Sequence, residues 1–177
     1  MPDSVLTHSG RILLARLLHG DRLAGITHCA LGDGDGAFVD PAKPPAPSIT
    51  QTALRHERCR KAAERLSYLL EDAAGPVLVD GLRYRESASE TPILGAFFRF
   101  AGMEATGFAI REVGFFGGMA AYVAGVSGAY AVDGVYDAAL NPTGQVLNPG
   151  YLYEVRHLPD VHKTVDTVME IIAVTRL

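Results

Sequence analysis

The sequence predicts an α+β fold in which an N-terminal helix packs on a mainly antiparallel sheet, with a long loop or arm before the final strand. Two patterns predict it: leucines near the start have helical spacing, and most later apolar segments alternate with a period of two. The 19 glycines indicate many turns between strands. A chain of 177 residues can bury one sizeable core, so we expect residues 1–177 to form a single domain.

The opening segment, "LTHSGRILLARLLHG", is typical of a helix. Thr7 is a suitable N-cap because its hydroxyl can accept a hydrogen bond from a free backbone N–H of the first turn. Leu14, Leu17 and Leu18 then fall on one helical face, and Gly20 stands where a C-terminal cap is expected. We therefore expect a helix over this segment.

The segment "RLAGITHCALG" that follows predicts a strand buried at least in part on both faces, which ends at a run of glycines. Residues 41–50 contain four prolines, counted from Pro41 to Pro47, and predict an exposed extended loop. Residues 49–72 carry overlapping helical and alternating patterns. We favour a helix for the first half of this stretch and leave the secondary structure of residues 61–72 open.

After Gly75 and Pro76 the pattern favours strands. The expected strands are "VLVDGLRYRES", "ILGAFFRFAG", "GFAIREVGFFGG", "MAAYVAGV" and "TVDTVMEIIAVTRL". Residues 128–150, which are rich in Gly, Asn and Pro, predict an extended arm before the last strand. Loops of this length often exist because they bind something, so we expect the arm to contact a neighbouring subunit.

The charge and composition exclude several kinds of partner. The net charge of −4 disfavours nucleic acid, because binding to phosphates needs clustered Lys and Arg. Nowhere do about 18 apolar residues run together, so we expect no insertion into a membrane. No secretory segment precedes Cys29 and Cys59, which favours a reducing compartment. Whether these two cysteines pair stays open, because sequence alone does not give their separation.

The stretch "ALGDGDGAF" invites a search for a ligand site, but the spacing fails two tests. If Asp33 is the first position of a calcium loop, then the fifth is Ala37 and the twelfth is Pro44, where oxygen ligands are needed. A dinucleotide site needs G-x-G-x-x-G at the start of a helix, whereas here a proline-rich loop follows. The remaining interpretation is a turn in which aspartates bond nearby backbone N–H groups.

No other pattern predicts catalysis, and we expect no catalytic residue, no bound metal and no cofactor. His56 and Cys59 lack two further ligands at zinc-site spacing. His28 and Cys29 are adjacent in an expected strand and so point to opposite faces, which is poor geometry for a nucleophile and its base. The sequence therefore favours a protein that is not an enzyme.

The stretch "GFAIREVGFFGG" places two charges in the middle of a strand. Arg111 and Glu112 lie on opposite faces, so each needs its own partner. Two interpretations stay open: both charges are solvated on an edge strand, or one of them enters a buried or intersubunit pair.

Three short motifs together resemble the N-terminal domain of phage tail-collar fibre proteins. That family has an L-T-x-x-G start, an A-L-G-D-G strand end and an R-E-I-G-L-F-like strand. The matching residues here are Leu6, Thr7 and Gly10; Gly32, Asp33 and Gly34; and Arg111, Glu112, Gly114 and Phe116. The resemblance implies that these residues are structural, and that the domain lies at the baseplate-proximal end of a tail fibre.

The resemblance also implies partners and a location. It implies a homotrimer in a phage tail or a phage-like injection particle, assembled in the bacterial cytoplasm and bound to other tail or baseplate proteins. Family members commonly continue into a fibrous shaft, whereas this chain ends at Leu177. We therefore expect either an adaptor that holds a separate fibre or a baseplate component that reuses the fold.

A different class of function stays as the alternative. A small carbohydrate- or calcium-binding module could form around Asp33 and Asp35, with Tyr122, Tyr130 and Tyr136 lining a shallow site. A calcium titration would distinguish this alternative from the structural role.

Overall fold

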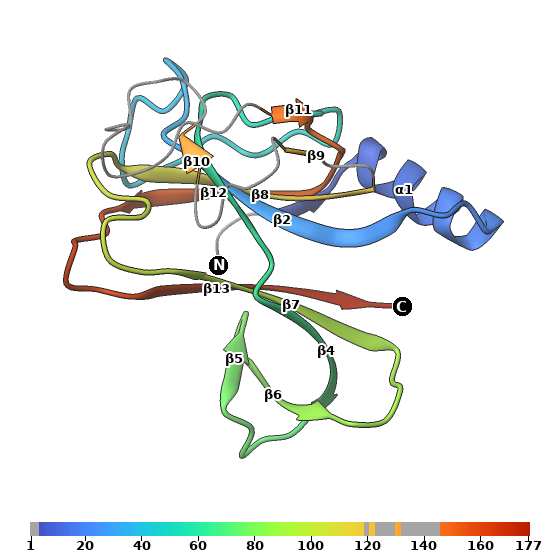
Figure 1. Ribbon diagram of the computed structural model, residues 1–177. Helices are drawn as coiled ribbons and strands as arrows, with labels where there is room; N and C mark the ends of the chain where they lie inside the picture. Colours follow the sequence, from blue (N-terminus) through green and yellow to red (C-terminus); the bar gives the residue numbers. More distant parts are fainter. Residues whose placement is uncertain (1–3, 119–120, 123–129, 132–145) are drawn as a thin grey trace.

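The computed structural model describes residues 4–118, 121–122, 130–131 and 146–177, and this part of the chain is mostly β-structure (Figure 1). Two antiparallel sheets face each other, and the described residues contain one short helix. The expected α+β fold is therefore wrong. The physical reason is that a helix of 12 residues adds a small patch beside one sheet, whereas the main core forms between the two sheets.

The helix α1 (His8–His19) begins and ends as its sequence predicts. Thr7 is extended and its hydroxyl accepts a hydrogen bond from the Gly10 N–H at 3.0 Å. Gly20 closes the helix with a φ of 93°, a left-handed conformation that suits glycine. Leu13 is the buried apolar residue of the helix, and it packs into the core near β2 and β12.

The first sheet has six strands in the order β1, β12, β8, β2, β3 and β10. Their bounds are β1 (Ser4–Leu6), β12 (Tyr151–Val161), β8 (Ile110–Gly118), β2 (Ala24–Gly32), β3 (Glu57–Ala62) and β10 (Tyr130–Ala131). The strand expected in "RLAGITHCALG" is confirmed as β2, which is buried along most of its length and lies between β8 and β3. A short separate ladder joins β9 (Ala121–Tyr122) to β11 (Val146–Asn148).

The second sheet has five strands in the order β13, β7, β4, β6 and β5, and it curls strongly (Figure 1). Their bounds are β13 (Met169–Arg176), β7 (Ile93–Phe100), β4 (Arg65–Glu71), β6 (Leu82–Ser87) and β5 (Val77–Val79). Asp80 and Gly81 join β5 to β6 with φ values of 50° and 81°. Positive φ at both central residues is the mark of a tight hairpin turn whose twist matches that of its strands.

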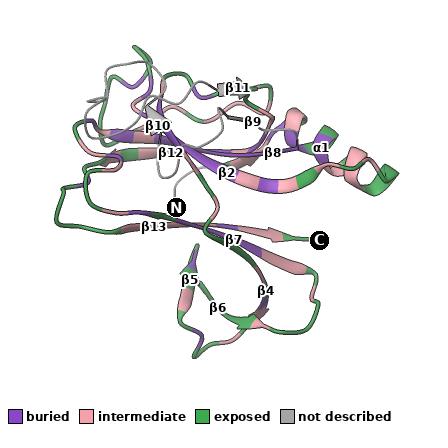
Figure 2. Ribbon diagram, viewed as in Figure 1, coloured by how far each residue is buried: buried purple, intermediate pink, exposed green. Residues whose placement is uncertain are grey.

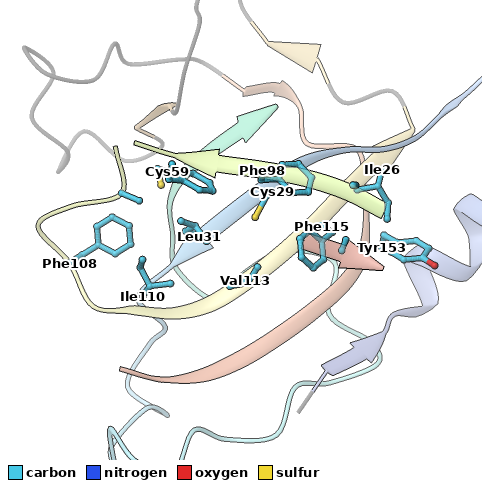
Figure 3. Close-up of a cluster of buried hydrophobic side chains, with 14 of the residues drawn as sticks. Ile26, Cys29, Leu31, Cys59, Phe98, Phe108, Ile110, Val113, Phe115 and Tyr153 are labelled. Atoms are coloured by element: carbon cyan, nitrogen blue, oxygen red, sulfur yellow. The ribbon is translucent and has the colours of Figure 1, made fainter. Parts of the chain in front are cut away.

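The main core lies between the two sheets, where buried positions of the strands face each other (Figure 2), and it is rich in aromatic rings (Figure 3). The rings of Phe98 on β7 and Phe115 on β8 stack with their centroids 5.7 Å apart. Cys29 and Cys59 are buried in this core as free thiols, and burial raises the pKa of both. The unbonded thiols answer the question of pairing that the sequence left open.

Two smaller clusters cover the outer faces of the sheets. On the first sheet, Leu54 packs with Phe116 and Leu152, so the irregular segment 33–56 forms a lid over the face that points away from the second sheet. Inside the curl of the second sheet, Leu69 packs with Tyr84. The first sheet is thus covered on both faces, and the curl of the second sheet provides its own cover.

Four expectations about individual elements are corrected. The segment "VLVDGLRYRES", expected as one strand, is the hairpin of β5 and β6. The helix favoured for the first half of residues 49–72 is absent: residues 49–56 are irregular and β3 begins at Glu57, whereas β4 settles most of the stretch left open at 61–72. The strand β12 was not expected at all. The last strand begins only at Met169, because the residues before it form a turn. In this turn the Thr167 N–H donates a hydrogen bond to the Thr164 carbonyl at 3.2 Å.

The misjudged helix has a physical explanation in its arginines. Arg60 on β3 is almost completely buried, and its guanidinium lies 3.7 Å from the centre of the Phe116 ring. An arginine that buries its stem and stacks its head behaves as a core residue, although a hydropathy pattern counts it as polar. Most of the strand expected at 119–126 and of the arm expected at 128–150 lies outside the described residues.

Candidate functional site

The motif residues at the end of β2 and in the middle of β8 lie side by side. In the antiparallel register, Gly32 stands opposite Glu112, and Ala30 stands opposite Gly114. The opening motif joins the same sheet, because Leu6 on β1 pairs with Glu154 on β12, the other neighbour of β8. Segments far apart in the sequence therefore form one continuous patch of the first sheet.

Glu112 ties the lid segment to the sheet. Its side chain is fully buried, and its two carboxylate oxygens accept hydrogen bonds from the backbone N–H groups of Arg55 at 3.0 Å and His56 at 3.1 Å. Gly32 makes room for this approach, since a Cβ there would overlap the His56 carbonyl. We call this arrangement the Glu112 clamp.

His157 on β12 stands directly opposite Glu112 and extends the clamp to the proline-rich loop. Its Nδ1 lies 2.6 Å from the Pro45 carbonyl oxygen, and because that oxygen can only accept, Nδ1 carries the proton. Its Nε2 lies 3.4 Å from a Glu112 carboxylate oxygen, and both side chains are fully buried. The Phe38 ring packs against the imidazole with centroids 4.9 Å apart.

Arg111, the neighbour of Glu112 on β8, has a different partner. Its guanidinium donates to both carboxylate oxygens of Asp160, at 2.7 and 3.1 Å, and this lowers the pKa of Asp160. The backbone N–H of Asp160 donates to the Pro41 carbonyl at 3.1 Å. The loop 41–50, which was expected to be exposed, is thus anchored to β12 at both Pro41 and Pro45.

The two aspartates of "ALGDGDGAF" face cationic side chains. The Asp33 carboxylate contacts His56 at 2.5 Å and Arg58 at 2.6 Å. The Asp35 carboxylate accepts from the backbone N–H of Ala37 and from Arg55, and these bonds lower its pKa. Since calcium would need these carboxylates as ligands, their present contacts fit the interpretation of this stretch as a turn.

The opening motif is bonded directly to β12. The Thr7 hydroxyl donates to the Leu152 carbonyl, and the Thr7 N–H donates to the Tyr153 carbonyl at 3.1 Å. A Cβ at Gly10 would overlap the Tyr153 backbone, so the absence of a side chain lets the helix touch the strand. Gly114 and Phe116, the last two motif residues, lie in the part of β8 that packs under the lid segment.

The carboxylate and the imidazole of the clamp are both closed off from solvent. A carboxylate and an imidazole can exchange protons, but Glu112 and His157 are both fully buried and therefore do not reach an external ligand. Across the described ranges, no group of three or more His, Cys, Asp or Glu side chains is placed to hold a metal ion. No helix in the same ranges has the length and apolar content needed to cross a membrane.

Sequence reasoning missed the partners of the motif residues, which are Arg55, His56 and Arg58 in the lid and β3, and His157 and Asp160 on β12. A usable signal was present for β12, because Tyr153 and Val155 alternate with Glu154 and Arg156. Of the tyrosines in the alternative binding module, Tyr136 lies outside the described residues, and only the backbone strands of Tyr122 and Tyr130 are described.

Comparison of the sequence with known protein families and with curated proteins found no match.

Proposed function

We propose that this protein is a non-enzymatic structural subunit of a phage tail or a phage-like injection particle. In this proposal it lies near the baseplate, assembles as a homotrimer and attaches or braces a tail fibre that belongs to another chain. It works as part of the particle after assembly in the bacterial cytoplasm.

The observation that carries the proposal is the convergence of the three motifs that resemble the tail-collar family. Thr7 is hydrogen-bonded to β12, and Glu112 on β8 lies opposite His157, which is also on β12. Asp33 directly follows β2, at the point where β2 pairs with β8. Residues that hold distant segments together, with their charges used inside the protein, are what a shared architectural motif requires. The proposal therefore assigns the motifs to the framework of an assembly subunit.

The absolute molar mass in solution tests the homotrimer. Light scattering after size exclusion should give about three times 18.9 kDa over a range of protein concentrations. The second step is to mix the protein with the purified products of neighbouring genes and to look for a complex of defined stoichiometry. A strict monomer at high concentration that binds none of these proteins would contradict the proposal.

A further inference from the structure

The edge strand β13 offers unused backbone hydrogen-bonding groups. It pairs with β7 in an unbroken register from Met169 to Arg176 and forms the end of the second sheet. The Leu177 N–H donates to the Pro92 carbonyl on the β7 side, so by alternation the N–H and C=O groups of Ile172 and Val174 point away from β7. Within the ranges that the structure describes, no strand pairs with this outer edge.

A groove of about 290 Å³ runs along the first half of this edge. Met169 and Ile171, which face the first sheet, and Glu170 and Ile172, which face the curl, all line it, so it follows the edge rather than one face of the strand. One wall comes from the first sheet and includes Val161, which is 41% exposed.

The opposite wall of the groove comes from the end of β5. Leu78 there is 56% exposed, so it adds accessible apolar surface to this wall. The volume is at the lower limit for a small-molecule pocket but is enough for a few side chains of a peptide. The groove therefore offers backbone bonds along its floor and apolar contacts on both walls, as an added β-strand requires.

The charges at the groove indicate what kind of strand fits. Asp80 at the β5 turn and Glu170 on β13 both line it, although Glu170 also stands opposite Arg99 on β7 and interacts electrostatically with Arg65. Arg156 also lines it, but its guanidinium is paired with Glu154 at 2.6 Å. The groove therefore complements a segment that carries Lys or Arg beside apolar residues.

We propose that this groove binds an extended segment of a second protein, which adds to β13 as a further strand. The segment places apolar side chains against both walls and a basic side chain near Asp80 and Glu170. Its identity as a segment of another tail protein rests on the proposed function, but the binding mode does not. Addition to an edge strand obtains affinity from backbone bonds and specificity from the side-chain pockets.

A labelled synthetic peptide, Lys-Thr-Val-Val-Val-Thr-Lys, whose valines fall on both faces of an extended strand, tests the binding mode by fluorescence anisotropy. We expect saturable binding to the whole protein, and weakening by about tenfold or more when the central Val of the peptide becomes Pro, because proline lacks the N–H that the ladder needs. On the protein side, Ile172→Pro removes an outward N–H and keeps the bonds to β7, whereas Ile172→Ala loses a similar apolar contact but keeps the N–H. The proline variant should lose binding and the alanine variant should retain most of it.

A charge exchange gives a second readout. Glu170→Lys should lower the affinity of the protein for the lysine-ended peptide and raise its affinity for a matched peptide with Glu at both ends. Absence of saturable binding to the native protein, or equal binding by the Ile172→Pro and Ile172→Ala variants with native circular dichroism, would overturn the inference. A change of oligomer mass in Ile172→Pro alone would also overturn it, because the occupant would then be a second copy.

The outcomes separate this inference from the proposed function. A trimer that ignores the peptide overturns the strand-binding groove only. A strict monomer that binds the peptide, and binds none of the neighbouring gene products, overturns the proposed function and leaves the groove standing.

Discussion

The two sheets of this protein differ in how far their polar groups and apolar side chains are already paired or covered. In the first sheet, Glu112, His157 and Asp33 are turned inward or paired, and the lid segment covers the outer face. In the second sheet, the edge of β13 and the exposed Leu78 remain beside an open groove. The distinctive motifs therefore belong to the sheet whose charges are paired and whose outer face is covered, while the proposed partner site lies at the edge of the second sheet.

This difference also predicts where stability is concentrated. Buried charges in the first sheet are compensated by specific partners, so the loss of one partner leaves another buried polar group without compensation. Side chains at the rim of the second sheet are already in contact with water, and their replacement costs little. The following substitutions test this contrast, beginning with the largest expected effect.

Removal of the Glu112 carboxylate should be the most damaging change. Glu112→Ala leaves the N–H groups of Arg55 and His56 without their buried acceptor, so we expect a loss of about 3–5 kcal/mol in the free energy of unfolding. Urea denaturation measures it. The matched control is Glu71→Ala on the second sheet, where an exposed pair with Arg176 should contribute about 1 kcal/mol or less. Equal losses in the two variants would contradict the contrast.

The buried His28 makes the first sheet sensitive to acid. Burial, together with the nearby Arg60, lowers the pKa of His28 from its ordinary value of about 6.5 to about 4. Between these two values the unfolded chain binds a proton that the folded chain does not, so stability is lost as the pH falls through this window, by about 3 kcal/mol at most.

Thermal unfolding at pH 7 and at pH 4.5 checks this expectation for His28. The variant His28→Gln should lose less stability on acidification than the native protein does, because its side chain does not titrate. The control His19→Gln, whose histidine side chain is 84% exposed, should keep the native response. If His28→Gln and the native protein lose the same stability between the two pH values, the expectation is wrong.

Individual elements show what the sequence could and could not predict. The helix α1 was predictable because Thr7 and Gly20 are local capping signals, and β2 because apolar residues dominate it and a run of glycines follows it. The strand β3 was not, because Arg58 and Arg60 are buried by long-range contacts that a local pattern does not contain. The Glu112 clamp was beyond prediction for the same reason, since its partners come from a loop and from β12.

The fold class was misjudged through two such elements. The sequence pattern favoured a helix where β3 lies and gave no prediction of β12. The predicted fold therefore had one sheet covered by the opening helix, instead of two sheets that pack on each other. The turn in "ALGDGDGAF" was interpreted from its spacing, which is a local property, and the contacts of Asp33 and Asp35 agree with that interpretation.

The contact between helix and strand at Gly10 should give a smaller effect than the clamp. Helix propensity alone predicts that Gly10→Ala stabilises the protein by up to about 1 kcal/mol. However, the new Cβ would overlap the Tyr153 backbone, so we expect a net loss of about 1–2 kcal/mol. Thermal unfolding measures the sign. Gly25→Ala, where a Cβ meets nothing within 4 Å, is the control and should change stability by about 0.5 kcal/mol or less.

The smallest change in stability is expected at the groove. Leu78→Ser alters a side chain that is 56% exposed, so the free energy of unfolding should stay within about 0.5 kcal/mol of the native value. The same variant should nevertheless weaken binding of the lysine-ended peptide, because it removes apolar area from one wall of the groove. Leu69→Ser in the same sheet is fully buried and should behave in the opposite way, with a large loss of stability. If Leu78→Ser instead unfolded the protein as readily as Leu69→Ser, then the rim of the second sheet would belong to the core, and the contrast between a covered first sheet and an open groove on the second would fail.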